Sequence, residues 1–179
     1  MKKNIFKLKN KNIIITGGNG FLGRQITNSL LKEKANVYII DIKHPQKKTS
    51  AKYFKSDITN EQDLTRILTL FKSKKIKIDV LINNAAIDYP PLKSKKDSLK
   101  LENFPNNLWD KDISVSLKGS YLCTKIFGSY MSKFNKGSII NVSSDLGIIA
   151  PDQRIYKNSG FIKPITYSVL KHCIIGLTK

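Results

Sequence analysis

The chain has 179 residues, and 40% of them are hydrophobic, which is enough to bury one sizeable core but argues against two independent domains. Its formal net charge is +19, from 32 basic and 13 acidic residues, an excess that ordinarily suggests an anionic partner. Arginine occurs only at Arg24, Arg66 and Arg154; the rest of the excess is scattered lysine, which lacks the planar fork used to read bases, so we predict no nucleic-acid partner.

The apolar runs are short. The basic start of the chain leads into only three consecutive isoleucines, too few for a signal peptide, and no later run approaches membrane-spanning length. We therefore expect a single cytoplasmic domain over residues 1–179 with no membrane partner. Cys123 and Cys173 lie far apart without metal-ligand spacing, so no metal site is predicted.

Apolar segments of strand length alternate along the chain with segments of helical periodicity. The predicted strands are 12–16, 36–41, 53–55, 78–83 and 138–142, and the predicted helices are 21–33, 61–72, 108–134 and 166–178. Continuously apolar strands indicate a parallel sheet covered on both faces, so we expect an α/β fold, a doubly wound sheet in three α/β/α layers. The long connections 88–107 and 145–163 follow strand carboxyl ends, where ligands bind in such sheets.

A glycine-rich turn separates the first predicted strand from the first helix. Glycines at 17, 20 and 23 allow a tight turn, close approach of a pyrophosphate and close packing of helix on strand, with the helix N-terminus facing the phosphate charge. The predicted cofactor-binding residues of this turn are Thr16, Gly17, Asn19, Gly20, Phe21, Leu22 and Gly23.

Two further strand ends carry polar residues suited to a dinucleotide. Asp41 ends the second strand 18 residues beyond Gly23, near the spacing at which a carboxylate binds the adenosine ribose. Such a carboxylate repels a 2′-phosphate, so NAD is favoured over NADP. The small residues at 83–86 close the fourth strand and permit close backbone approach, while the asparagine amides can tie strand ends together.

The last predicted helix carries a proton-transfer pair. Tyr167 and Lys171 are four residues apart and share one helix face, where a cation can lower the pKa of a phenol toward the neutral range. Ser143 and Ser144 end the fifth strand just before this helix, and we select Ser144 as the serine that reaches the same carbonyl site.

The ordered set of 16–23, Asp41, Asp57, 83–86, Ser144 and the Tyr167/Lys171 pair resembles the short-chain dehydrogenase/reductase family from residue 11 onward. The resemblance implies a Rossmann-like domain that binds NAD(P) and a small-molecule substrate. It implies that Tyr167 is the general acid/base, that Lys171 holds the nicotinamide ribose, and that Ser144 orients the substrate oxygen. It adds to the cofactor site Asp57, Ile58, Asn84, Ala85 and Ala86, together with Tyr167 and Lys171.

The chain departs from the family pattern at several places. The glycine spacing resembles an extended branch, whereas 83–86 resembles the single-domain branch, which we favour because the chain is short. Ser116 stands where the family carries the asparagine of a catalytic tetrad, and we include it as a relay residue. The 23 residues between Ser144 and Tyr167 resemble a long-loop subgroup linked to bacterial surface-carbohydrate pathways (flagellin glycan and nonulosonate), which implies a sugar-derived substrate with Arg154 as an anchor.

The chain ends at Lys179, in or just after the Tyr167 helix, so we expect a truncated fold with an incomplete C-terminal sheet edge. The family resemblance also implies a homo-oligomer.

The leading hypothesis is an oxidoreductase that transfers hydride between nicotinamide and a carbonyl or alcohol carbon. The alternative is a catalytically impaired NAD-binding remnant. A basic nucleic-acid-binding module is disfavoured, because the aromatic residues are not interleaved with the lysines and are expected in the core: Tyr53, Phe54, Phe71 and Phe134.

Overall fold

The computed structural model describes residues 7–87, 89, 99–156, 159 and 162–179. Part of the predicted long connections, residues 88, 90–98, 157–158 and 160–161, lies outside the described residues. The chain divides into two compact units, one formed by Met1–Ala85 and Gly119–Ile140 and the other by Ala86–Lys118 and Asn141–Lys179.

The first unit contains a five-stranded sheet of order β3-β2-β1-β4-β5. The strands are β1 (Asn12–Thr16), β2 (Asn36–Asp41), β3 (Lys52–Lys55), β4 (Val80–Asn83) and β5 (Ser138–Asn141). β1 pairs in parallel with β2 and β4, and β2 with β3. Ile13, Ile14 and Ile15 are at most 1% exposed, since apolar residues on both faces of a central parallel strand are buried. The predicted doubly wound fold is confirmed.

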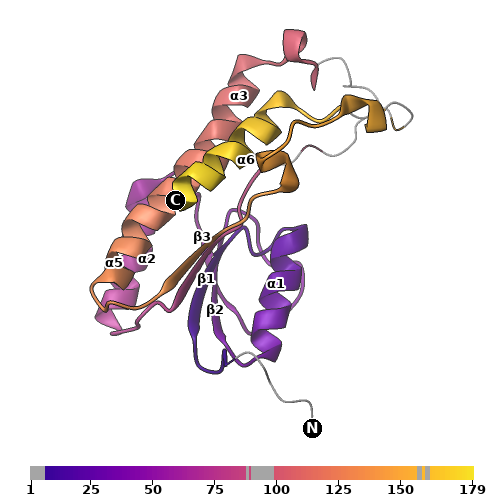
Figure 1. Cartoon of the computed structure of the whole chain (residues 1–179). Coiled ribbons are helices and arrows are strands. Elements are labelled where there is room, and N and C mark those ends of the chain that lie inside the picture. Colours follow the sequence, from indigo (N-terminus) through magenta and orange to yellow (C-terminus); the bar gives the residue numbers. More distant parts are fainter. Residues whose placement is uncertain (1–6, 88, 90–98, 157–158, 160–161) are drawn as a thin grey trace. The chain divides into compact units, whose positions relative to one another are not determined.

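Helices cover both faces of this sheet (Figure 1). α1 (Phe21–Lys32) covers one face, and α2 (Glu61–Ser73) covers the other together with the helical segment that includes α4 (Gly119–Cys123) and α5 (Ser129–Ser132). α2 begins where Asn60 accepts hydrogen bonds from the amides of Gln62 and Asp63. The centre of its Phe71 ring lies 4.7 Å from the centre of the Tyr38 ring on β2.

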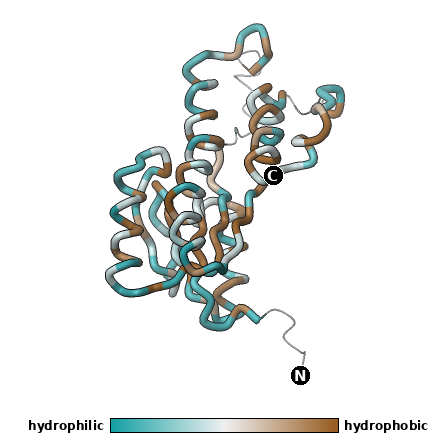
Figure 2. The backbone as a smooth tube through the Cα atoms, turned by 60° about the vertical axis from the view of Figure 1, so that its left-hand side comes forward, coloured by the Kyte–Doolittle hydropathy of each residue, from teal (hydrophilic) through white to brown (hydrophobic). Residues whose placement is uncertain are grey.

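The second unit is built on two helices in contact, α3 (Asn106–Asp112) and α6 (Ile165–Thr178), with short 3-10 turns at Leu101–Asn103, Asp145–Gly147 and Gln153–Tyr156. Figure 2 shows hydrophobic residues along α6 as far as the C-terminus. Leu170 and Ile174 of α6 are buried.

The predicted helix 108–134 is not regular. α3 passes into a π-helical turn at Ile113–Lys118, and a second π-helical turn, Thr124–Gly128, separates α4 from α5. Such turns inside longer helices often mark functional sites, and the first one contains Ser116.

Of the four aromatic residues predicted in the core, Phe71 is buried, Tyr53 and Phe54 are only partly buried, and Phe134 is 36% exposed. Phe134 departs most from the prediction. It follows α5 in the turn before β5, where one edge contacts Tyr130 and the Lys77 Nζ lies 4.8 Å from the ring centre. An amphipathic lysine therefore covers a ring that the core does not enclose.

No helix in the described part of the chain is both long enough and apolar enough to cross a bilayer.

Candidate active site

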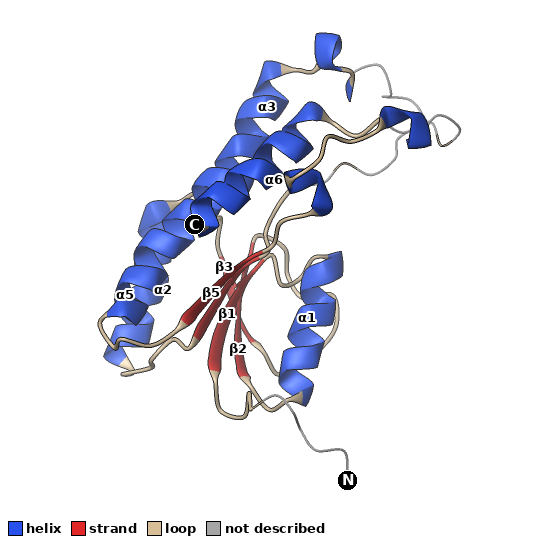
Figure 3. Ribbon diagram, in the orientation of Figure 1, coloured by secondary structure: helices blue, strands red, loops and turns tan. Residues whose placement is uncertain are grey.

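The glycine-rich turn joins β1 to α1 in the first unit (Figure 3). Gly17 has a φ of +65°, which favours glycine, and a Cβ on it would lie 2.8 Å from the Ala85 Cα. A Cβ on Gly23 would lie 2.1 Å from the Gly17 carbonyl oxygen. The turn therefore requires glycine at both positions, and no side chain intrudes there on a group that approaches the backbone.

The turn opens onto the N-terminus of α1. Gly20 occupies the N-cap position, and no side chain there accepts the first helical amides. Phe21 and Leu22 begin the helix with 83% and 49% of their surface exposed. Free amides and the helix dipole suit the phosphate groups of a dinucleotide, so the local geometry fits the predicted role of this segment.

Thr16 ties the turn to the end of β4. Its Oγ1 accepts hydrogen bonds from the backbone amides of Asn84 (3.1 Å) and Ala85 (3.0 Å). The side-chain Nδ2 of Asn84 donates in return to the backbone carbonyl oxygens of Thr16 (3.0 Å) and Gly17 (3.1 Å). The structure thus brings together Thr16, Gly17, Asn84 and Ala85, and these bonds hold the turn in position.

Asp41 braces the same turn from β2. It is 8% exposed; its Oδ2 accepts from the Asn19 amide and its Oδ1 from the Lys43 amide, both at 2.9 Å. Asn19 also donates from its side chain to the Lys43 carbonyl oxygen. Asp41, which was predicted to bind the adenosine ribose, therefore also holds the glycine-rich turn in shape, a structural role that sequence reasoning did not assign.

The remaining predicted adenine-side residues lie after β3. Ile58 is buried against Gly119, where a Cβ would approach the Ile58 side chain to 2.5 Å. Asp57 is exposed, and its Oδ1 accepts from the amide and hydroxyl of Thr59, both at 2.9 Å. Ala86 is the first residue of the second unit and is exposed.

The predicted proton-transfer residues lie on α6 in the second unit. The Lys171 Nζ donates a 2.8 Å hydrogen bond to the Val142 carbonyl oxygen and lies 5.6 Å from the centre of the Tyr167 ring. The Lys163 Nζ lies closer, 3.6 Å from the same ring centre. The ammonium groups of Lys163 and Lys171 therefore both lie near the Tyr167 ring. Sequence reasoning missed Lys163, although it precedes Tyr167 by four residues across the helix start at Pro164.

The two serines after β5 have different partners. The Ser143 Oγ donates to the Lys171 carbonyl oxygen at 2.9 Å and so links two segments within the second unit. The Ser144 Oγ donates to the Asp145 Oδ1 at 2.7 Å and accepts from the Leu146 amide at 3.3 Å, which caps the turn Asp145–Gly147. Ser143 is thus a structural link, whereas the hydrogen bonds of the Ser144 hydroxyl to described residues lie within its own turn.

Ser116 is buried in the π-helical turn that contacts α6. One residue before that turn, Asp112 is 2% exposed and accepts hydrogen bonds from Thr166 and Tyr89. Neither Asp112 nor Thr166 was predicted from sequence, since a single acid and a single threonine 54 positions apart carry no local signal. Burial raises the pKa of the Tyr89 phenol, and the Asp112 carboxylate raises it further.

Arg154 is held by a neighbour. Its Nε and Nη2 donate to Asp152, with the Nη2 to Oδ2 distance at 2.8 Å, and 90% of its side-chain surface is exposed. This bond lowers the pKa of the Asp152 carboxyl.

A model of the short chain dehydrogenase family matches residues 11–179. The chain belongs to the short-chain dehydrogenase/reductase family. The Rossmann-like sheet and the glycine turn agree with this membership. Relatives in the family are named as dehydrogenases and reductases.

Individual family members resemble the chain closely in fold and moderately in sequence. An NAD-dependent glycerol dehydrogenase of Listeria innocua is 27% identical over 97% of this chain and 64% of its own length. A short-chain dehydrogenase of Leptospira borgpetersenii with bound NAD+ is 26% identical with a TM-score of 0.82, covering 96% of this chain and 64% of that structure. The structure of ElxO with NADP bound is 28% identical with a TM-score of 0.76, and the match covers 94% of this chain and 65% of that structure. The chain thus spans just under two thirds of the length of each of these relatives.

Proposed function

We propose that the protein transfers a hydride, with NAD as cofactor, between nicotinamide and a carbonyl or alcohol carbon of a small, polar, sugar-derived substrate, and that Tyr167 is its general acid/base. The observation that carries the proposal is the placement of the Lys163 and Lys171 ammonium groups 3.6 and 5.6 Å from the centre of the Tyr167 ring. Positive charge beside the reacting group stabilises the negative charge that develops there during proton transfer.

The first unit supplies the proposed cofactor residues. Gly17 and Gly23 leave the backbone uncovered at the start of α1, so the pyrophosphate can approach the helix amides. The cofactor would contact the residues at the end of β4, which are Asn84, Ala85 and Ala86. Its adenine would contact Asp57 and Ile58. Nicotinamide, when bound, supplies or accepts the hydride.

The second unit supplies the proposed proton chemistry. In carbonyl reduction, the Tyr167 hydroxyl gives its proton to the substrate oxygen as charge develops on it, and the reverse reaction returns that proton. Ser144 donates a hydrogen bond to the same oxygen once its hydroxyl turns from Asp145. Lys171, aimed by its bond to Val142, binds the nicotinamide ribose, and Ser116 supports reprotonation of Tyr167.

Asp41 supports the choice of NAD. A carboxylate accepts about four hydrogen bonds, so the two amide bonds from Asn19 and Lys43 leave capacity for ribose hydroxyls. Its charge repels a 2′-phosphate. The glycerol dehydrogenase relative is NAD-dependent and the Leptospira structure holds NAD+, whereas ElxO holds NADP.

A polyhydroxylated substrate is supported by the glycerol dehydrogenase relative and by the charged residues Asp152 and Arg154 in the loop that follows Ser144. In that loop, Arg154 binds the substrate when its ion pair with Asp152 opens.

The catalytic assignment is tested by comparing Tyr167→Phe with Tyr121→Phe, which removes a hydroxyl from a side chain 49% exposed on α4. NADH binding, followed by nicotinamide fluorescence, and oxidation of a panel of polyols and aldoses are measured for both. Tyr167→Phe should lower kcat at least about 100-fold, the usual contribution of general acid–base catalysis, with NADH affinity preserved. Equal turnover by the two variants would exclude Tyr167 as the acid/base.

The cofactor assignment is tested by titration with NADH and NADPH. Tighter binding of NADH, with the preference lost in Asp41→Ser but kept in Asp57→Ser, supports the ribose role of Asp41. Binding of NADPH at equal strength would overturn the choice of NAD. Size-exclusion chromatography with light scattering tests the homo-oligomer that we also propose.

A further inference from the structure

A pocket lies in the first unit, at the end of the sheet opposite the glycine-rich turn. It has a volume of about 740 Å³ and is lined by the first residues of β1, β2 and β3 and by the segments that lead into β4 and β5. Six of its lining residues are lysines, and one is acidic. The lysines are Lys9, Lys11, Lys52, Lys75, Lys77 and Lys136, and the acid is Asp79.

The positive charge of this pocket, which we call the lysine pocket, is not balanced internally. Lys11 forms a 2.8 Å ion pair with Asp79. Within the part of the chain that the structure describes, Lys9, Lys75 and Lys136 have no acidic group within 4.0 Å. Six ammonium groups and one carboxylate leave a net charge of +5 around a single concavity. Their mutual repulsion is relieved only by counterions or by an anionic ligand.

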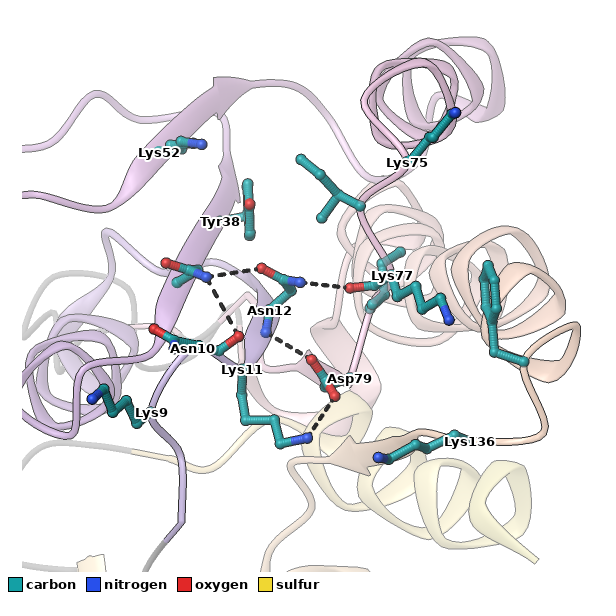
Figure 4. Close-up of a pocket in the computed structure, with 14 residues that line it drawn as sticks. Lys9, Asn10, Lys11, Asn12, Tyr38, Lys52, Lys75, Lys77, Asp79 and Lys136 are labelled. Atoms are coloured by element: carbon teal, nitrogen blue, oxygen red, sulfur yellow. Dashed lines mark hydrogen bonds and ion pairs between the residues drawn. The ribbon is translucent and has the colours of Figure 1, made fainter.

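Several of these lysines are held in place. The Lys52 Nζ lies 5.3 Å from the Tyr38 ring centre, and the Lys77 Nζ lies 4.8 Å from the Phe134 ring centre. The floor between them is fixed, because the Asn12 side chain donates to the Lys77 carbonyl oxygen at 2.8 Å and accepts from Asn36 at 3.1 Å. Figure 4 shows the labelled lysines arranged around this floor. A ligand would thus find part of the charge already ordered.

We propose that the lysine pocket binds a compact polyphosphate-type anion at a site separate from the dinucleotide site. Lysine binds phosphate oxygen as a strong point charge, and the volume falls within the range of small-molecule sites. The dinucleotide turn lies at the carboxyl ends of the same strands, beyond Thr16 and Asp41, so the two sites occupy opposite ends of one sheet.

A single-stranded nucleic acid fits this surface less well. Stacking of bases needs open aromatic faces, but Tyr38 is 4% exposed and Lys77 covers Phe134. No arginine is among the described residues that line the pocket, so none is available there to read a base edge. The same chemistry therefore favours a small ligand whose charge is concentrated in phosphate groups.

The proposal is tested with inorganic tripolyphosphate, titrated calorimetrically into the 179-residue chain at low and at moderate salt. The pocket variant combines Lys9→Gln, Lys75→Gln and Lys136→Gln. The matched control combines Lys32→Gln, Lys72→Gln and Lys111→Gln, three exposed lysines outside the pocket that carry the same charge. Circular dichroism and NADH fluorescence establish that both variants fold and retain the cofactor site.

We expect the pocket variant to bind tripolyphosphate about tenfold more weakly, since each exposed ion pair contributes a factor of roughly two, while the control changes less than about threefold. NADH should not displace the anion from the unsubstituted chain. Equal losses in the two variants would assign binding to diffuse surface charge, displacement by NADH would assign it to the glycine turn, and tighter binding of an oligothymidylate would assign it to nucleic acid. Each of these results overturns the proposal.

Discussion

Thr166 donates a 2.6 Å hydrogen bond from its hydroxyl to the Asp112 Oδ2, and both side chains are only 2% exposed. The bond joins α3 to α6 inside the second unit, immediately before Tyr167 on α6 and one turn before Ser116. A second hydroxyl, from Tyr89, donates to the other carboxylate oxygen at 2.7 Å. Since a buried carboxylate without hydrogen bonds is costly, this cluster fixes how the two helices of the unit pack.

Replacing Thr166 by valine should destabilise the second unit. The substitution keeps the volume and leaves the Asp112 Oδ2 without its partner, which costs about 1–3 kcal/mol of unfolding free energy. Thr166→Ser keeps the donor and loses one methyl group, so its cost should be roughly 1 kcal/mol or less. Urea unfolding followed by circular dichroism measures both, and a larger loss in the serine variant would contradict the role of the hydroxyl.

The glycine turn yields a prediction with an internal control. In Gly23→Ala the new Cβ would lie 2.1 Å from the Gly17 carbonyl oxygen, so α1 must move away from the turn. We expect a loss of about 1–3 kcal/mol in stability together with weaker NADH binding. Gly176 lies inside α6, where an added Cβ would meet nothing within 4 Å, so Gly176→Ala should instead stabilise by about 0.5–1 kcal/mol. If Gly23→Ala bound NADH normally, the close approach would not matter for the cofactor.

The two cysteines should differ in reactivity. Burial raises the pKa of the Cys123 thiol to about 12, so almost no thiolate is present near neutral pH, and the side chain is 0% exposed. Cys173 on α6 is only partly buried. Titration with a chromogenic disulfide at pH 8 should modify one thiol in the native protein and two in denaturant. Cys173→Ser should remove the native reaction, and rapid modification of Cys123 would show that the first unit opens.

Local patterns in the sequence predicted the features that depend on nearby residues. Ile13 to Ile15, Gly17 and Gly23 lie within one short segment, and apolar runs and glycine spacing suffice to place a buried strand, a tight turn and a helix start. The additional brace from Asp41 to the Asn19 amide was missed, because a strand-ending acid is compatible with ligand binding and with a structural bond.

Features assembled from distant segments were not predictable in the same way. Lys9, Lys52, Lys75 and Lys136 come from separate parts of the chain, and only the strand order brings them to one pocket. The π-helical turn around Ser116 was not predicted, because a helical pattern of apolar residues does not distinguish i→i+4 from i→i+5 hydrogen bonding. Scattered lysine in the sequence was therefore interpreted as general surface charge.

The ion pair of Asp79 with Lys11 makes a prediction about acid stability. Burial alone would raise the pKa of Asp79, but the hydrogen bonds from Lys11 and from the Asn12 amide outweigh it and hold the pKa below its usual value. A carboxyl whose pKa is lower in the folded protein contributes stability above its unfolded pKa, near 4, and that contribution is lost as the pH falls through the folded value.

Asp79→Asn should therefore cost about 1–2 kcal/mol at pH 7 and much less at pH 3. Asp152→Asn, which breaks the more exposed pair with Arg154, is the control and should change stability less at pH 7. Urea unfolding at both pH values measures the loss of unfolding free energy in each variant. If the loss caused by Asp79→Asn does not shrink on acidification, the carboxylate charge contributes nothing to stability at this position.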